Sequence, residues 1–287
     1  MAITLGTNIP SFTARVNLNQ ANDSLTKTME RLSTGLKINR AGDDAAGLVI
    51  SENMEAQIRG SKQAMQNIQN AQSFLTVAED GMVSISDHYQ RINDLLINMA
   101  NDSNDLNSRT AAVQEIIERL DEIDRLAETT NFNGRTMLDG SVDEIIIQMG
   151  PGYDEDLDTL DISAALTDCH IAEMETTLPD NLNPESGDFD PSNANCRAFM
   201  EKIQAAIDTI ATKRGLLGAY ENRMESSYDS MSIRIESLET AKALYTDADI
   251  AEEATNLTSQ QIMQQLNASV LTIANSLQQT ALQLLGA

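Results

Sequence analysis

Aromatic and basic side chains are scarce in this chain. Its 287 residues include no Trp, five Tyr and five Phe, so any core must consist almost entirely of Ile, Leu, Val, Met and Ala. Such residues suit the seams between helices. Lys and Arg number 19 against 44 Asp and Glu, which leaves a net charge of −25. We therefore expect no binding to nucleic acid or to an anionic membrane surface, because both need clustered Lys and Arg.

Long apolar runs are lacking as well. The chain has no stretch of about 18 apolar residues, so we expect no membrane-spanning helix. Its first ten residues lack the basic and apolar regions of a secretory signal. By that rule alone the protein stays in the cytosol, unless it leaves by a route that cleaves no signal. The sequence also has no phosphate loop, dinucleotide fingerprint or nucleophile elbow, so no cofactor is expected.

The histidines and paired carboxylates do not form a catalytic or metal-binding pattern. His88 lies inside a long apolar periodic run and is expected to be structural. His170 adjoins Cys169, but a nucleophile and its base usually come from distant positions. Residues 154–158 resemble the start of a calcium loop, yet Thr159 and Ala165 stand where the loop needs Gly and Glu. We expect no catalytic residue and no metal site.

Cys169 and Cys196 are the only cysteines, and they fit neither a CxxC nor a zinc pattern. In an oxidising environment a disulfide between them would stabilise the fold by roughly 3–4 kcal/mol. Two unpaired thiols are the alternative, and the sequence leaves both open.

Helical periodicity dominates the rest of the chain. A first helix is expected over residues 5–33, followed by breaks at Gly35 and Gly42 and a helix cap at Asp43 or Asp44. Apolar residues then recur every three or four positions in four further stretches. These stretches are 50–99, 113–127, 203–245 and 250–284, with a break at 101–105 and a helix cap near 246–249. The first of them would make a helix about 75 Å long.

The middle segment (residues 131–195) has a different texture. Asn133-Gly134 and Asp139-Gly140 are turn signals, and strands are expected at 144–148 and 157–162. No Lys or Arg occurs between residues 141 and 195, and we expect that part to be exposed. The apolar stripes thus lie mainly near the two ends, which must pair with each other or with neighbouring copies. This arrangement favours an assembly subunit over an enzyme.

Several motifs carry a resemblance to a known family. The stretch from Arg31 to Leu48, RLSTGLKINRAGDDAAGL, resembles bacterial flagellin. So do the stretches 122–125, 131–134, 138–140, 247–253 and 260–265, in the same order along the chain. The resemblance covers residues 1–165 and 195–287.

The resemblance implies a mainly α fold. Long antiparallel helical rods and coiled-coil terminal helices would carry a small β-hairpin element, without large outer domains. Residues 1–42 and 247–287 would form the inner tube of a filament, and residues 43–246 the outer-tube domain, including the short acidic β segment 131–195.

The implied function is that of a structural subunit that self-assembles into the bacterial flagellar filament for motility. The alternative is a hook–filament junction protein, which shares flagellin-like ends. An enzyme carried in the middle segment has too little length and no constellation of reactive groups. The resemblance also implies an extracellular location after type III export without a cleaved signal peptide. Its partners would be other copies of the chain, a flagellar export chaperone, and cap and junction proteins.

Two sets of residues are expected to carry these contacts. Those expected to pack in the filament are Leu18, Leu25, Leu32, Leu257, Leu266, Val270, Ile273 and Leu277. The family's motif for a host Toll-like receptor is matched by Gln90, Arg91, Leu95 and Glu115. The alternative for this second set is that it serves only contacts between subunits.

Overall fold

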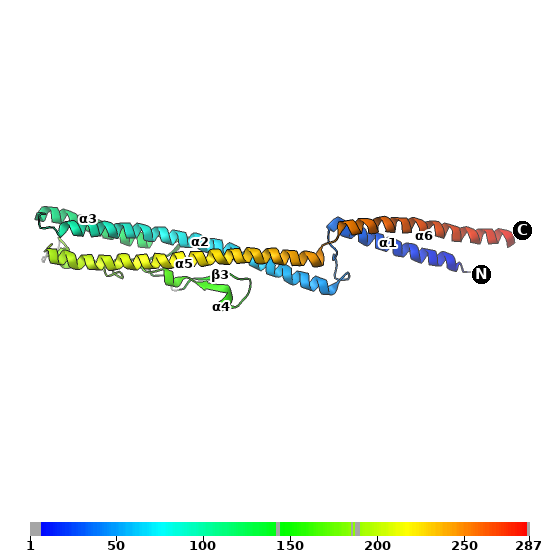
Figure 1. Cartoon of the computed structure of the whole chain (residues 1–287), viewed down its shortest axis with the longest axis horizontal. Coiled ribbons are helices and arrows are strands. Elements are labelled where there is room, and N and C mark those ends of the chain that lie inside the picture. The colour runs from blue at the N-terminus through cyan, green and yellow to red at the C-terminus, as the bar shows by residue number, and fades with distance from the viewer. Residues whose placement is uncertain (1–6, 142–143, 185, 187–189, 286–287) are drawn as a thin grey trace. The chain divides into compact units, whose positions relative to one another are not determined.

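The structure, a computed structural model, describes residues 7–141, 144–184, 186 and 190–285. Helices dominate it, as predicted (Figure 1). The helices are α1 (Ile9–Thr34), α2 (Ala45–Met99), α3 (Leu106–Thr129), the short α4 (Glu155–Asp158), α5 (Asn193–Thr246) and α6 (Ile250–Leu285). Two 3-10 turns, η1 (Ser163–Ala165) and η2 (Asp180–Leu182), lie between α4 and α5.

Capping side chains define the ends of the first helices. Helix α1 begins after Asn8, whose side chain accepts a hydrogen bond from the Ser11 amide. It ends at Gly35, which adopts a left-handed conformation with φ of 74°. That conformation costs glycine little, so the predicted break at Gly35 is confirmed. Asp44 accepts hydrogen bonds from the amides of residues 46 and 47 and caps α2, one of the two expected positions.

Two more aspartates cap α3 and α6. Asp105 accepts a hydrogen bond from the Ser108 amide at the start of α3. Asp249 accepts from the amides of residues 251 and 252 and starts α6, which confirms the helix cap expected there. These caps supply partners for main-chain N–H groups that have none within the helix.

The chain divides into two compact units. The first comprises Met1–Ile58 and Glu236–Ala287, and the second comprises Arg59–Ile235. In the first unit α1 packs against α6 along their length (Figure 1). The described helices near the two ends of the chain therefore pair with each other. Main-chain hydrogen bonds join the linkers beside them, from the Lys37 N–H to the Thr246 oxygen at 2.7 Å and from the Ala248 N–H to the Gly35 oxygen at 2.9 Å.

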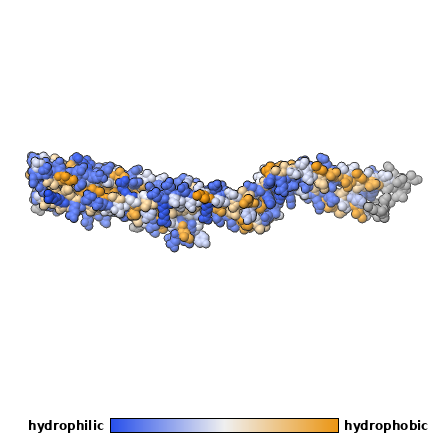
Figure 2. Space-filling view, in the orientation of Figure 1, coloured by the Kyte–Doolittle hydropathy of each residue, from blue (hydrophilic) through white to orange (hydrophobic). Residues whose placement is uncertain are grey.

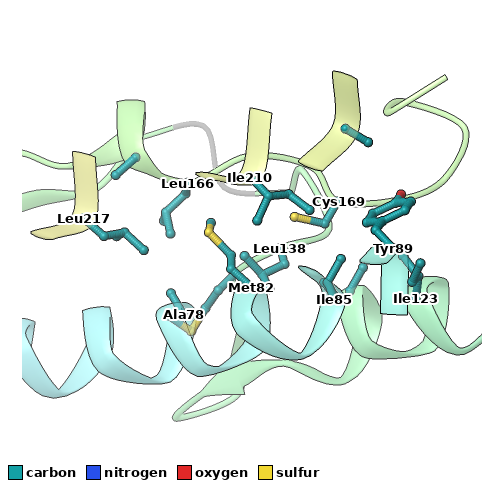
Figure 3. Close-up of a cluster of buried hydrophobic side chains, with 14 of the residues drawn as sticks. Ala78, Met82, Ile85, Tyr89, Ile123, Leu138, Leu166, Cys169, Ile210 and Leu217 are labelled. Atoms are coloured by element: carbon teal, nitrogen blue, oxygen red, sulfur yellow. The ribbon is translucent and has the colours of Figure 1, made fainter. Parts of the chain in front are cut away.

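The second unit has one continuous apolar core. Side chains from α2, α3, α5 and the middle segment converge in it (Figure 3). The predicted periodic positions fill this core, since Met82, Ile85, Ile92, Leu96, Ile116, Ile123, Ile203 and Ile210 are all buried. Tyr89 is fully buried as well, and its hydroxyl makes a 2.9 Å hydrogen bond with the Thr176 hydroxyl.

Two small antiparallel ladders follow α3. Strands β1 (Asn131–Phe132) and β2 (Arg135–Thr136) are joined by Asn133 and Gly134, which both have positive φ. This is the two-residue turn that the Asn-Gly signal predicts. Strands β3 (Ile146–Gln148) and β4 (Thr159–Asp161) pair with Ile147 opposite Leu160. Both expected strands are therefore confirmed, each shorter than its sequence pattern.

The expectation that residues 141–195 are exposed is wrong for several of their apolar side chains, although Leu157 is 81% exposed as expected. Ile162, Ala165, Cys169 and Leu182 are fully buried in the core of the second unit. Main-chain bonds hold the segment in place, since the Cys169 N–H donates to the Leu138 oxygen at 2.8 Å. The lack of Lys and Arg between residues 141 and 195 therefore gives information only about the side of this segment that faces the solvent. Apolar residues between the acidic ones give the segment an inward face, because burying them is favourable.

Two glycines inside α2 let the middle segment approach the helix. A Cβ atom on Gly60 would lie 2.9 Å from the Cβ of Pro151. A Cβ atom on Gly81 would lie 2.8 Å from a methyl carbon of Thr130 and 2.9 Å from one of Leu138. Each glycine thus provides space for a side chain that packs directly on the helix backbone.

Candidate assembly interface

The seam between α1 and α6 follows a regular heptad pattern. On α1 the heptad positions 11, 14, 18, 21, 25, 28 and 32 are buried or half-buried, and Asn22, Glu30 and Arg31 beside them are half-buried as well. The buried and half-buried positions on α6 are 253, 257, 260, 264, 267, 271, 274 and 278. Steps of three and four residues are those of a coiled coil. Leu18, Ala21, Leu25 and Leu32 lie on this face, as the apolar spacing of the first helix predicts, whereas Met29, which the same spacing includes, is 47% exposed.

Polar side chains occupy many seam positions and bond across it. The Gln264 side-chain amide donates to Asn22 Oδ1 at 2.7 Å. At the start of α1, Asn8 Nδ2 donates to Gln278 Oε1 at 2.7 Å and to the Ala274 oxygen at 3.2 Å. Three further pairs span the seam, namely Ser11 with Asn275 at 2.8 Å, Asn267 with the Asn17 oxygen at 3.3 Å, and Arg31 with Glu253 at 3.2 Å. From one pair to the next, the residue number rises along α1 and falls by nearly the same amount along α6. The two helices are therefore antiparallel and keep one register.

The most apolar face of α6 is turned away from α1. We define the outer stripe as Ile262, Met263, Leu266, Val270, Ile273 and Leu277, all of which are exposed. Figure 2 shows hydrophobic residues at the surface over these helices. A contiguous apolar surface of this kind marks a site of protein contact.

The structure divides the residues that we expected to pack in a filament into two groups. Leu18, Leu25, Leu32 and Leu257 are half-buried in the α1–α6 seam. Leu266, Val270, Ile273 and Leu277 lie on the outer stripe, where they are between 51% and 64% exposed. The apolar pattern of α6 does not predict its seam, because Gln and Asn occupy positions 260, 264, 267 and 278. Their three-four spacing was the signal that would have found them.

The four residues expected to form a receptor motif lie on α2 and α3 in the second unit. Arg91 Nε donates to Glu115 Oε1 at 3.0 Å, and the Arg91 Nη2 donates to Glu115 Oε2 at 3.3 Å. Arg119 Nε also donates to Glu115 Oε1 at 3.0 Å, and its Nη1 lies 3.4 Å from His88 Nδ1. Hydrogen bonds from Arg91 and Arg119 lower the pKa of Glu115, so this carboxylate is ionised at neutral pH.

The other two motif residues differ in exposure. Gln90 is exposed, and its side chain donates to Ser86 Oγ at 3.3 Å. Leu95 is only 8% exposed and belongs to the core of the second unit. The motif thus presents the Gln90 side chain and the Arg91–Glu115 ion pair, while Leu95 supports the helix from within. Burial and the nearby Arg119 lower the pKa of His88, which favours its neutral form.

The two cysteines are buried and unpaired. Burial raises the pKa of Cys169 to about 12 and also raises that of Cys196. Both thiols are therefore protonated at neutral pH and poorly nucleophilic. His170 Nδ1 lies 2.7 Å from Asp168 Oδ1, so its bonded partner is that carboxylate.

Two absences hold for the described part of the chain. No cluster of three or more His, Cys, Asp or Glu side chains there is arranged to hold a metal ion. Among the described helices, none is both apolar and long enough to span a lipid bilayer.

Comparison with known proteins points to one family. Residues 5–143 match the model of the bacterial flagellin N-terminal helical region, and residues 200–285 match the bacterial flagellin C-terminal helical region. The chain is 34% identical to a flagellin of Halalkalibacterium halodurans over 97% of its own length and 98% of the relative's. It is 35% identical to the flagellar filament 33 kDa core protein of Treponema phagedenis and 32% identical to a flagellin of Bacillus subtilis, with the same coverage.

Similar chains also occur among solved structures. The crystal structure of Bacillus cereus flagellin has 27% identity and a TM-score of 0.47, with 58% of this chain and 88% of that chain covered. The structure of a hook-associated protein from Vibrio parahaemolyticus has 15% identity and a TM-score of 0.59, with 71% and 99% covered. The second similarity concerns the fold alone.

Proposed function

Because this chain belongs to the bacterial flagellin family, we propose that its terminal helices build the bacterial flagellar filament by packing between copies. The chain is a structural subunit of that filament and acts outside the cell after export. The distant hook-associated structure does not favour the junction alternative, since its similarity is one of fold.

The outer stripe of α6 is the observation that carries the proposal. Its large apolar side chains are exposed although α6 already packs against α1. Covering them with α1 and α6 of neighbouring copies would remove their surface from water, at about 25 cal/mol for each Å² buried. We assign this contact to Leu266, Val270, Ile273 and Leu277. Leu18, Leu25, Leu32 and Leu257 would instead hold the α1–α6 pair together.

The proposal extends to the parts of the chain. Residues 1–42 and 247–287 would form the inner tube, and residues 43–246 the outer tube, which carries the short segment 131–195. The structure does not describe residues 1–6, 286 and 287, nor the side chains of 281–285, so the inner-tube contacts of these residues lie outside the described residues.

Deleting residues 258–287 tests the proposal. We expect a soluble protein that folds normally in its second unit and forms no filaments, because the outer stripe is gone. Electron microscopy of seeded, purified protein measures the result, and circular dichroism checks that the remaining helices fold. Filaments formed by the truncated chain would refute the assignment.

We further propose that export proceeds through the flagellar type III channel without a cleaved signal peptide. An export chaperone would bind the C-terminal helical region, since this region carries the uncovered apolar surface. Cap and junction proteins would guide and anchor assembly. We assign the chain no catalytic role, because its thiols are protonated and its histidines are engaged with Asp168 and Arg119.

A host Toll-like receptor is a further proposed partner. The exposed Gln90 side chain and the Arg91–Glu115 ion pair support it, because they form a polar surface that a partner can contact. In reporter cells treated with monomeric protein, Arg91→Ala should reduce the response by about tenfold or more, as expected for a central interface arginine. Arg125→Ala is the matched control. It also removes an arginine that is paired with a glutamate, because Arg125 and Glu122 form an ion pair within α3. Equal responses to the two variants would exclude this surface.

A further inference from the structure

Helix α6 uses its less apolar face to bind α1. The seam positions 260, 264, 267 and 278 carry Gln or Asn, and position 253 carries Glu. The outer stripe offers Ile, Met, Leu and Val instead. Apolar burial alone would turn the outer stripe towards α1, whose own seam presents Leu18, Leu25 and Leu32. Something other than apolar burial therefore decides the rotation of α6.

We attribute the rotation of α6 to the hydrogen bonds across the seam. Gln264 bonds to Asn22 near the middle of the seam, and Gln278 bonds to Asn8 at the start of α1. Arg31 and Glu253 pair at the other end, and Glu253 is only 8% exposed. These pairs lie in one register along the whole seam. Rotating α6, or moving it by one heptad, would separate every pair at once.

We propose that the polar pairs Asn22–Gln264, Asn8–Gln278 and Arg31–Glu253 determine which face of α6 binds α1 and in which register. By holding the polar face inward they keep the outer stripe available to second copies of the chain. This inference rests on the proposed function, because it concerns how the subunit prepares for assembly.

The physical basis is the cost of unpaired polar groups. Glu253 is buried and the amides in these pairs are half-buried, so without its partner each group would lose part of its hydrogen bonding to water and gain none in return. An α6 rotated to its apolar face would gain apolar burial within the chain but would leave the polar groups of α1 unpaired. Polar residues at seam positions select register and partner in coiled coils at a cost in stability. In this chain the cost in stability arises because less apolar surface is buried between α1 and α6.

Replacing one polar pair by two leucines tests whether the pairs determine the register or are merely accommodated in the seam. In full-length protein, Asn22→Leu combined with Gln264→Leu makes the seam more apolar but removes its central hydrogen bond. The matched control is the exchange Asn22→Gln with Gln264→Asn, which keeps two amides and the combined side-chain length. Ser11→Cys with Asn275→Cys is added to every protein as a register reporter, because these two side chains are 2.8 Å apart.

Two quantities are measured, the critical concentration for filaments seen by electron microscopy and the yield of the disulfide between the introduced thiols. Peptide mapping separates that disulfide from Cys169 and Cys196. We expect the leucine pair to raise the critical concentration at least about tenfold and to lower the disulfide yield at least about fivefold, because polar seam residues set register. The exchanged pair should stay within about twofold of the parent by both measures.

The outcomes separate this inference from the proposed function. If the leucine pair leaves either quantity unchanged, or lowers the critical concentration, the polar pairs do not select the assembly face and the inference is wrong. If the parent protein without substitutions forms no filaments when seeded, the proposed function fails instead.

Discussion

His170 shows how a single residue can connect the middle segment of the second unit to a helix. Its Nδ1 lies 2.7 Å from Asp168, and its Nε2 lies 4.0 Å from Glu128 on α3. Burial lowers the pKa of His170, but the hydrogen bond to Asp168 and the charges of Asp168, Asp124 and Glu128 outweigh it, so the pKa is raised. Protonation of His170 therefore favours the folded state.

The first prediction concerns the pH dependence of stability. A pKa that is higher in the folded than in the unfolded state adds stability below the ordinary value of 6.5. That stability is lost as the pH rises through the folded-state pKa. His170→Gln should therefore lower the free energy of unfolding more at about pH 5.5 than at about pH 8.5. Urea unfolding of both proteins measures it, and a difference that does not change with pH would contradict the prediction.

The second prediction concerns the glycines of the long helices. Gly81→Ala should destabilise the second unit by about 1–2 kcal/mol, because the new methyl group would overlap Thr130 and Leu138. Gly218→Ala on α5 is the control, since its Cβ would meet nothing within 4 Å. That change should stabilise by about 0.5–1 kcal/mol through helix propensity alone. Thermal unfolding measures whether each substitution lowers or raises the stability. A stabilising Gly81→Ala would show that Thr130 and Leu138 leave room for a methyl group at position 81.

At the level of elements, α6 differs from α2, α3 and α5 in leaving its most apolar face uncovered. In α2, α3 and α5 the apolar stripe packs into the core of the second unit. In α6 the seam is largely polar and the apolar side chains face outward. Helix α6 therefore resembles one half of an interface rather than a finished part of a fold.

The third prediction tests that view of α6. Leu266→Ser with Ile273→Ser should change the stability of the monomer by less than about 0.5 kcal/mol, because both side chains are more than half exposed. The critical concentration for filaments should rise at least about tenfold, because less apolar surface is buried on assembly. Sedimentation of polymerised protein measures it. Leu157→Ser is the control, since Leu157 is 81% exposed but lies outside the outer stripe.

At the level of the whole molecule, the net charge of −25 opposes assembly. Bringing many copies together places like charges near one another, and the range of that repulsion is set by salt. The middle segment adds to the effect, because residues 141–195 contain no Lys or Arg. Apolar contacts between copies must therefore overcome a repulsion that salt can screen.

The fourth prediction follows from this charge. Raising NaCl from about 20 mM to about 200 mM should lower the critical concentration for filaments several-fold, because the Debye length falls from about 20 Å to about 7 Å. Light scattering of seeded protein follows the change. A critical concentration that rises with salt would mean that attractive ion pairs between copies dominate instead.

The sequence by itself determined the long helices, several of their ends and the Asn133-Gly134 turn, although α5 begins at Asn193, ahead of the apolar stretch that predicted it. These features depend on local chemistry, such as the aspartate caps at Asp44 and Asp249, the left-handed Gly35 and the Asn133-Gly134 turn. The apolar spacing also identified the core-facing side of α2, α3 and α5, because a heptad stripe must be buried somewhere.

Only the tertiary structure decided which of the available partners each surface meets. It placed the apolar residues of the acidic segment in the core, left the two thiols unpaired and turned the polar face of α6 towards α1. Local patterns do not contain this information, because burial and hydrogen bonding depend on residues far apart in the chain. Asn22 and Gln264 are neighbours only because two helices at opposite ends of the chain pair in one register.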